Sequence, residues 1–246
     1  MAVELDRPGS VESLYIARGE PVEPWRPIMS GDVFGGVEIL GVPEHDLVML
    51  ISHPCSMRRG AALLPSLQAL PIRSHQSVAL EAWSSGHFRA LPLPALRQSE
   101  GTGELAAILT EIGMVPTSEL DLAKRIACLS EKGIVLALQR FFHCLSRVRV
   151  GLDTLAVHAQ APLEEAALLE EWNETLAQAQ TERGADQETV LAEEARQFEE
   201  LLSSHPAGGS APLRAGLGIA SEQASVRRIV GRAIDVRQAS LDLDAG

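Results

Sequence analysis

The polar residues best suited to chemistry are concentrated in one short segment, 52–60, with the sequence Ser-His-Pro-Cys-Ser-Met-Arg-Arg-Gly. Histidine exchanges protons near neutral pH, so His53 is suited to general acid or base catalysis. Cys55 is suited to act as a nucleophile if a base lies nearby. The forked donors of Arg58 and Arg59 match a phosphate or carboxylate group. The segment is therefore a candidate catalytic site.

The same residues also fit a purely structural interpretation. Single histidines and cysteines more often serve packing than catalysis, and a free cysteine behaves as a small apolar residue. In this interpretation the pair His53-Pro54 ends a strand, Cys55 is buried, and the two arginines are solvated. The residues of the segment alone leave both interpretations open.

Metal and nucleotide chemistry have less support. His75 and His87 join His53 and Cys55 as residues of the right type for zinc, but their spacing is not that of a known zinc site. The chain contains no GxxxxGK[ST] loop, no GxGxxG between a strand and a helix, and no GxSxG elbow. We therefore predict neither a metal nor a cofactor.

Short strands surround the candidate segment. It follows an apolar run at 46–52, which predicts a buried strand, and loops at strand ends commonly carry functional sites. A proline at position 71 moves the strand predicted at 67–72 to a sheet edge or a strand end. Several short strands close together are typical of a small barrel. The other predicted strands cover 32–40, 87–93 and 104–113.

A helical pattern replaces the strands after Pro116. Ser130 is suited to cap a helix. Apolar residues that recur three and four positions apart then predict one buried face, and polar residues predict the opposite, exposed face. The apolar set is Ile134, Leu138, Phe141, Phe142, Leu145 and Val148, and the polar set is Gln139, Arg140, Arg147 and Arg149.

Further helices are predicted toward the C-terminus. Pro162 is expected to open an acidic helix, because proline is tolerated at the first helical position. Another helix is predicted at 186–203, and a flexible break at 206–218 precedes a final helix at 222–239.

Charge divides the chain into two halves. Residues 1–150 hold 14 Lys and Arg against 16 Asp and Glu, a net charge of −2, whereas residues 151–246 hold 7 against 17, a net charge of −10. Nucleic acid would therefore bind the N-terminal half, and the acidic half would bind a basic partner or keep the protein in solution. We predict no membrane span, because no stretch approaches the required apolar length, and we expect a cytoplasmic protein with reduced cysteines.

Four segments, taken in order, carry a family resemblance. They are Gly31-Asp32-Val33, the run Val-Met-Leu-Ile-Ser at 48–52, Pro-Ile-Arg-Ser at 71–74, and Lys-Arg-Ile-Ala-Cys-Leu-Ser at 124–130 before a helix. Together they resemble the MazF/PemK toxin family over about residues 30–146. The resemblance implies a small SH3-like β-barrel with a closing helix, a homodimer, and a metal-independent endoribonuclease of a toxin–antitoxin or phage-defence system.

The resemblance also proposes catalytic residues. Ser74 matches the Thr or Ser that the family uses after its third strand. The family's Arg before the second strand is missing, because His45-Asp46-Leu47 stands in its place. Without that Arg, the developing phosphorane charge lacks its donor. Residues that would replace it are Arg58, Arg59 or Arg73.

The sequence thus predicts an α+β chain. Its expected parts are an extended lead-in at 1–29, a MazF/PemK-like barrel with its closing helix at 30–160, an acidic helical region at 161–204, and a flexible linker with a terminal helix at 205–246. The predicted function is recognition of nucleic acid, with RNA cleavage by Ser74, Arg58, Arg59 and His53. The alternative is a non-catalytic scaffold, in which the barrel has lost its chemistry and the acidic helices bind a protein partner.

Overall fold

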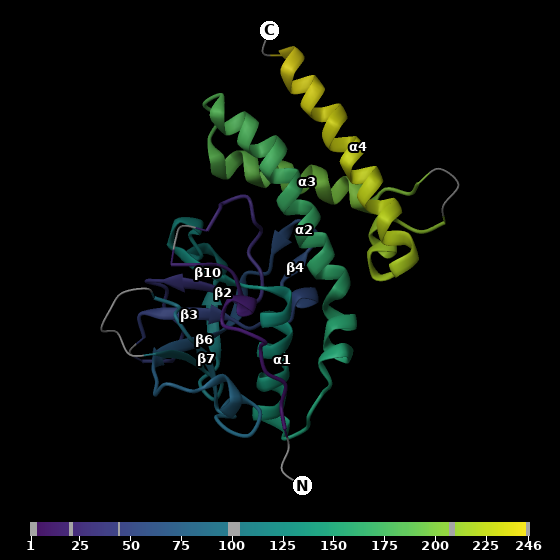
Figure 1. Ribbon diagram of the computed structural model, residues 1–246. Helices are drawn as coiled ribbons and strands as arrows, with labels where there is room; N and C mark the ends of the chain where they lie inside the picture. The colour runs from purple at the N-terminus through teal and green to yellow at the C-terminus, as the bar shows by residue number, and fades with distance from the viewer. Residues whose placement is uncertain (1–3, 20–21, 44, 98–103, 207–209, 245–246) are drawn as a thin grey trace. The chain divides into compact units, whose positions relative to one another are not determined.

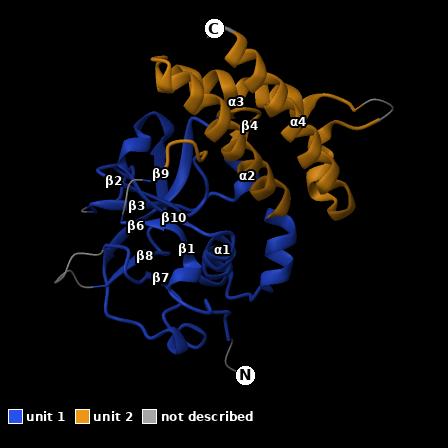
Figure 2. Ribbon diagram, turned by 45° about the horizontal axis from the view of Figure 1, so that its top comes forward, with its two compact units in different colours: residues 1–22, 28–57, 63–159 blue, residues 23–27, 58–62, 160–246 orange. Residues whose placement is uncertain are grey.

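The computed structural model describes residues 4–19, 22–43, 45–97, 104–206 and 210–244 (Figure 1). It confirms a mixed α+β chain with a curled antiparallel sheet and a C-terminal helical region. Within these ranges, no helix is both long enough and apolar enough to cross a membrane. Figure 2 distinguishes two compact units: unit 1 contains 1–22, 28–57 and 63–159, and unit 2 contains 23–27, 58–62 and 160–246.

The sheet of unit 1 is antiparallel throughout. Seven of its described strands follow one path, and β9 (Gly113–Pro116) pairs with β6 off that path. The order along the path is β1 (Tyr15–Arg18), β10 (Arg125–Leu129), β2 (Asp32–Gly35), β3 (Leu47–Leu50), β6 (Ser66–Ser74), β8 (Leu105–Ile108) and β7 (Ala90–Leu93). The lead-in expected at 1–29 therefore contributes β1, a strand of the sheet.

The sheet curls until its two ends approach each other. The Tyr15 hydroxyl of β1 donates a hydrogen bond to the carbonyl oxygen of Pro94, directly after β7, at 3.2 Å. Helix α1 (Glu131–Ser146) contacts both β10 and β7. The result is a half-barrel with a helix packed against strands from both ends of the path (Figure 1).

Short elements connect the strands. A two-stranded hairpin is formed by β4 (Arg58–Arg59) and β5 (Ala62–Leu63). The 3₁₀ turns of unit 1 are η1 (Glu12–Leu14), η2 (Pro54–Ser56), η3 (Leu80–Trp83), η4 (Thr117–Glu119) and η5 (Leu122–Lys124).

Pro71 lies in a central strand, so the prediction of an edge strand was wrong. Strand β6 pairs with β3 along one side, where Pro71 stands opposite Val48. On its other side, β9 pairs with residues 66–69 and β8 with residues 72–74. Pro71 therefore lies opposite the gap between β9 and β8, where a missing N–H donor costs least.

The opening Gly31-Asp32 of the resemblance has a structural role. Gly31 adopts φ +84°, and a Cβ at this position would lie 2.7 Å from the Cβ of Leu129, so a larger residue is excluded. Asp32 accepts a hydrogen bond from the Met29 N–H at 3.0 Å and pairs with Arg125 at 3.1 Å. Both side chains of this pair are buried, at 1% and 0% exposed. This motif joins β2 to β10 and is not available to substrate.

Helix α1 departs from its predicted amphipathic pattern. Ser130 caps it as expected, by accepting the Gly133 N–H at 3.0 Å. Gln139 and Arg140, however, are fully buried. The N-terminal segment covers this side, because Asp6 exchanges two hydrogen bonds with Gln139. Three residues of the predicted apolar face, at or just after the end of the helix, are exposed instead: Phe142, Leu145 and Val148.

The C-terminal part of unit 2 is built from helices. Helix α2 (Leu152–Glu182) starts in unit 1, and it is followed by α3 (Gln187–Ser203), the 3₁₀ segment η6 (Leu213–Gly218) and α4 (Ala220–Asp244). Pro162 lies inside α2, so the prediction that it opens a helix was wrong. The buried positions continue in helical spacing on both sides of the proline, at Leu155, Ala159, Leu163 and Ala166, so packing maintains the helix.

The core of unit 2 includes the segment that was predicted as a flexible break. Leu213 and Leu217 of η6 are buried in one apolar cluster with Trp172, Phe198 and Val230. Helix α3 occupies the predicted range, and it begins after Asp186, whose carboxylate accepts the Thr189 N–H. Residues 207–209 of the break lie outside the described residues.

Candidate functional site

His53 and Cys55 form a close pair in the loop after β3. His53 Nδ1 lies 2.8 Å from Cys55 Sγ and accepts the Cys55 backbone N–H at 3.3 Å. Burial lowers the pKa of His53 below its ordinary value, and the charge of His158 lowers it further. The imidazole is therefore neutral at pH 7. Cys55 is exposed, so the interpretation of this residue as a buried packing residue was wrong.

Arg58 and Arg59 lie on hairpin strand β4, which groups with unit 2. Arg58 donates a hydrogen bond to the Ala61 carbonyl oxygen at 3.3 Å, across the turn of the hairpin. Arg59 is exposed. These two predicted site residues therefore belong to a different unit from His53 and Ser74.

Ser74 and His53 lie at opposite ends of β6. The Ser52 hydroxyl accepts the Gln68 N–H at 2.8 Å, which fixes the His53 loop near the start of β6. Ser74 is six residues further along the same strand, or about 20 Å at the usual rise of a strand. The structure thus does not bring His53 to Ser74.

The segment before β3, where the resemblance expects an arginine, lies at the same end of the sheet as Ser74. The register pairs Leu47, the first residue of β3, with Ile72 of β6. The segment before β3 therefore reaches the end of β6 at which Ser74 is exposed. His45 occupies this segment, but its Nε2 accepts the Ile39 N–H at 3.0 Å and so stabilises a turn.

Arg73, one of the arginines that the resemblance offered as a substitute, is already engaged by other groups. Its guanidinium donates to the Pro43 carbonyl oxygen at 2.8 Å and pairs with Glu111 at 2.7 Å. The charge is therefore neutralised, at the edge of a shallow depression of about 660 Å³ that Gly41 and Val42 also line. Successive residues of a strand point to opposite faces, so Arg73 and Ser74 face apart.

The loop that follows Ser74 contains two histidines for which the sequence gives only weak support as metal ligands. The loop between β6 and β7 returns on itself, so that His75 at its start and His87 near its end have ring centroids 5.8 Å apart. Both rings are half-buried. His87 adopts φ +57°, an uncommon conformation for a residue other than glycine. His75 and His87 thus form a second candidate site, and Ser74 immediately precedes His75 in the chain.

Buried Arg140 holds the end of this loop in place. Its guanidinium donates hydrogen bonds to the carbonyl oxygens of Trp83 and, at 3.4 Å, of His87. It also lies 5.1 Å from the centroid of the Trp83 ring. Burial lowers its pKa to about 10, so Arg140 stays charged at neutral pH.

Glu104 holds the start of the loop. Its carbonyl oxygen accepts the His75 N–H at 2.7 Å, and its carboxylate accepts the Ser77 hydroxyl at 2.9 Å and the Val78 N–H at 3.4 Å. The two histidines therefore stand on backbone that is fixed from β8 and from α1. The sequence could not reveal this site, because the two histidines are far apart in the chain and only the folding of the loop brings their rings together.

An exposed cation, Arg89, lies two residues after His87 in the chain. Its charge and that of exposed Arg147 both act on Cys144 near the end of α1, so the two arginines share one region of unit 1. Such a region suits a phosphate backbone.

Within the part of the chain that the structure describes, no group of three or more His, Cys, Asp or Glu side chains is placed to hold a metal ion. Neither the models of known protein families nor the curated proteins include a match to this chain.

Proposed function

We propose that unit 1 is a MazF/PemK-like module of a bacterial toxin–antitoxin or defence system, which recognises RNA and cleaves it without a metal. The observation that carries this proposal is the pair of His75 and His87, with ring centroids 5.8 Å apart, directly after Ser74. The curled sheet and its packed helix support an SH3-like barrel. The MazF/PemK resemblance also implies a reaction at the end of β6 where Ser74 lies.

The proposed reaction uses the RNA's own 2′-hydroxyl as the nucleophile. One histidine removes the proton of that hydroxyl, and the other donates a proton to the leaving 5′-oxygen. Both residues are half-buried, and the imidazole ring is the side chain that enzymes use most often as a general acid or base. Ser74 donates a hydrogen bond to a non-bridging phosphate oxygen, and Arg89 supplies the positive charge that the missing family arginine would provide.

The test is cleavage of single-stranded RNA by the purified full chain in EDTA. We expect cleavage by the parent, and a loss of about 10²-fold or more in the variants His75→Gln and His87→Asn, as for removal of a general acid or base. Asparagine is chosen at position 87 because it tolerates a positive φ. Ser74→Ala and Arg89→Gln should also slow cleavage.

Two control variants separate this site from the one that the sequence predicts. His205→Gln removes an exposed histidine of unit 2 and should leave cleavage unchanged. Arg58→Ala/Arg59→Ala should also leave the cleaving step unchanged. Cleavage that survives in the two histidine variants but disappears in the double arginine variant would reject our site and retain the ribonuclease. No cleavage by the parent would reject the ribonuclease itself.

A non-catalytic scaffold is the second candidate, and an exposed apolar surface on α4 favours it. Val236 and Leu243 are 71% and 81% exposed, and their seven-residue spacing places them on one side of the helix. We expect this surface of α4 to contact either a second copy of the chain or a different protein. Light scattering tests the homodimer: Val236→Ser/Leu243→Ser should convert it to a monomer, while Leu40→Ser, at a position of unit 1 that is 65% exposed, should not.

A further inference from the structure

The hydrogen bonding of His75 decides which of its ring nitrogens can bind a ligand. Nδ1 lies 2.8 Å from the carbonyl oxygen of Gln76. A carbonyl oxygen only accepts hydrogen bonds, so Nδ1 carries the proton, and in the neutral ring Nε2 has a free lone pair. A backbone carbonyl that holds one nitrogen in this way also orients the metal-binding histidines of many proteins.

The rings of His75 and His87 are close enough to share one metal ion. Zn²⁺ binds an imidazole nitrogen at about 2.0–2.1 Å, which places the ion about 3.2 Å from the ring centroid. Two rings that share an ion tetrahedrally therefore have centroids about 5.2 Å apart. The observed separation is 5.8 Å, with the ring planes at 75° to each other. Rotation about the broad χ2 torsion of histidine is sufficient to close this difference and to turn a nitrogen toward the ion.

The backbone that carries both histidines is already fixed. The His75 N–H donates to the Glu104 carbonyl oxygen at 2.7 Å. The His87 carbonyl oxygen accepts from buried Arg140 at 3.4 Å. Ligands on fixed backbone lose little entropy when an ion binds. Among the described residues, no third His, Cys, Asp or Glu completes the pair, so water must fill the remaining positions of a bound ion. Two protein ligands make a reversible site, in contrast to the four of a structural zinc site.

We propose that His75 and His87 together bind a divalent transition metal of the nickel and zinc type, and that the bound ion inhibits the proposed RNA cleavage. Imidazole is a preferred ligand of these ions. A metal-bound nitrogen has no lone pair with which to accept a proton, so the ion removes the two groups assigned to proton transfer. The inhibition rests on the proposed function, whereas the binding of the metal does not.

The test of binding is a calorimetric titration of the full chain with NiCl₂ in a buffer without a chelator. Nickel is used because a thiol such as exposed Cys55 competes more strongly for zinc. We expect a site whose affinity falls at least tenfold in His75→Gln and in His87→Asn. Cys55→Ser and His205→Gln, which alter an exposed thiol and an exposed histidine away from the pair, should keep that site.

Two results would overturn the metal site: unchanged affinity in both histidine variants that alter the pair, or loss of the site in Cys55→Ser. Urea unfolding of each variant ensures that the titrations compare folded proteins.

The test of inhibition is the RNA cleavage assay with NiCl₂ in place of EDTA. Saturating nickel should slow the parent at least tenfold, and added EDTA should restore the rate. Magnesium, which prefers oxygen ligands, is the control ion and should have no effect. Nickel binding without slower cleavage would overturn the inhibition and retain the metal site. A parent that binds nickel but cleaves no RNA would reject the ribonuclease and its inhibition, while the calorimetry would still confirm the metal site.

Discussion

The guanidinium of Arg140 donates a hydrogen bond to the carbonyl oxygen of Trp83 and lies 5.1 Å from the centroid of the Trp83 ring. Both side chains are fully buried. A charge in this position is stabilised by the ring and by backbone oxygens. The same guanidinium contacts the His87 carbonyl, so this interior contact supports the residue that we assign to proton transfer.

Arg140→Met should destabilise unit 1. The replacement fills a similar volume but removes the Arg140 donor from the Trp83 carbonyl oxygen and leaves the His87 carbonyl oxygen with the Ala90 N–H as a donor. We expect a loss of about 2–4 kcal/mol in total. Urea unfolding followed by tryptophan fluorescence measures the loss. Arg147→Met, at an exposed position of the same helix end, should change stability by less than about 0.5 kcal/mol. Equal effects of the two substitutions would contradict the role given to Arg140.

The buried pair of Asp32 and Arg125 should show strong coupling. Asp32→Ala alone leaves a buried guanidinium without its carboxylate, and we expect a loss of about 3–5 kcal/mol. Arg125→Met should cost a similar amount, but the double variant should cost much less than the sum, because neither charge is then left alone. A double-mutant cycle in urea gives the coupling. Additive losses would show that the pair is not an energetic unit.

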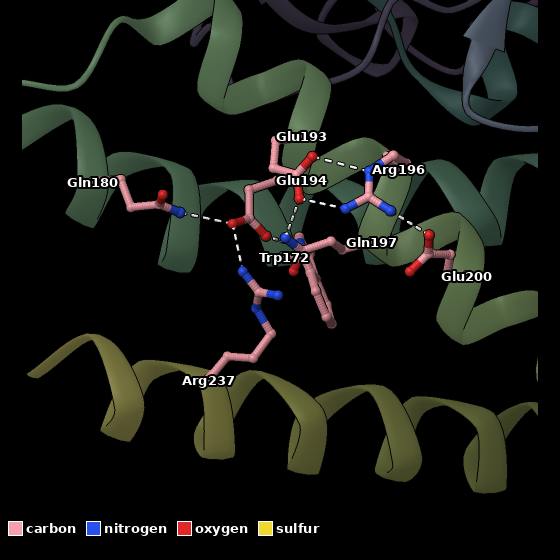
Figure 3. A network of polar contacts seen from close by, with 8 residues as sticks. All are labelled: Trp172, Gln180, Glu193, Glu194, Arg196, Gln197, Glu200 and Arg237. Atoms are coloured by element: carbon pink, nitrogen blue, oxygen red, sulfur yellow. Dashed lines mark hydrogen bonds and ion pairs between the residues drawn. The ribbon is translucent and has the colours of Figure 1, made fainter. Parts of the chain in front are cut away.

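Glu194 should be the most sensitive acidic residue of unit 2. Its carboxylate accepts hydrogen bonds from Trp172 at 2.7 Å, Gln180 at 2.7 Å and Arg237 at 2.6 Å (Figure 3). It is 1% exposed. Glu194→Ala should therefore cost about 2–4 kcal/mol, because three donors lose a charged acceptor in the interior. The fluorescence of Trp172 should shift in the folded variant.

The exposed neighbours of Glu194 provide the contrast. A hydrogen bond from Arg196 and another from Gln197 lower the pKa of Glu193 to about 2. Water surrounds this ion pair and screens it, so Arg196→Ala should change the urea midpoint little. A loss as large as that of Glu194→Ala would contradict the difference that burial makes in this network (Figure 3).

The lowered pKa of His53 predicts a dependence of stability on pH. The unfolded chain binds a proton at this residue near pH 6.5, whereas the folded chain binds it only at lower pH, because burial and the charge of His158 oppose protonation. Above pH 6.5 His53 is unprotonated in both states and contributes no pH dependence. As the pH drops from 6.5 toward the lower pKa of the folded state, the unfolded chain binds the proton first, and the free energy of unfolding falls. Urea midpoints between about pH 7 and pH 5 should therefore fall more in the parent than in His53→Gln. Parallel curves would contradict the lowered pKa.

Local chemistry made several elements predictable. Ser130 has a side chain that accepts an N–H group of the first helical turn, and it caps its helix as expected. Asp186 caps the next helix in the same way. The apolar run at 46–52 forms a buried strand, and residues 186–203 form a helix. The edge strand predicted from Pro71 and the helix start predicted from Pro162 were both wrong, because they were inferred from the backbone of proline alone. Neighbouring strands accommodate Pro71, and buried side chains on both sides of Pro162 maintain its helix.

The sequence by itself determined the fold class, the division of charge, the capped helices and the proximity of His53 to Cys55, because each depends on composition or on residues close in the chain. Only the tertiary structure decided that Ser74 and His53 lie far apart, that the His75 and His87 rings meet, and that Arg140 is buried. These relations arise from the register of β6 and from the return of a loop, which involve residues distant in sequence. Hydrophobic periodicity predicts which face of a helix is exposed, but it cannot show that another segment covers that face, as Asp6 does at Gln139.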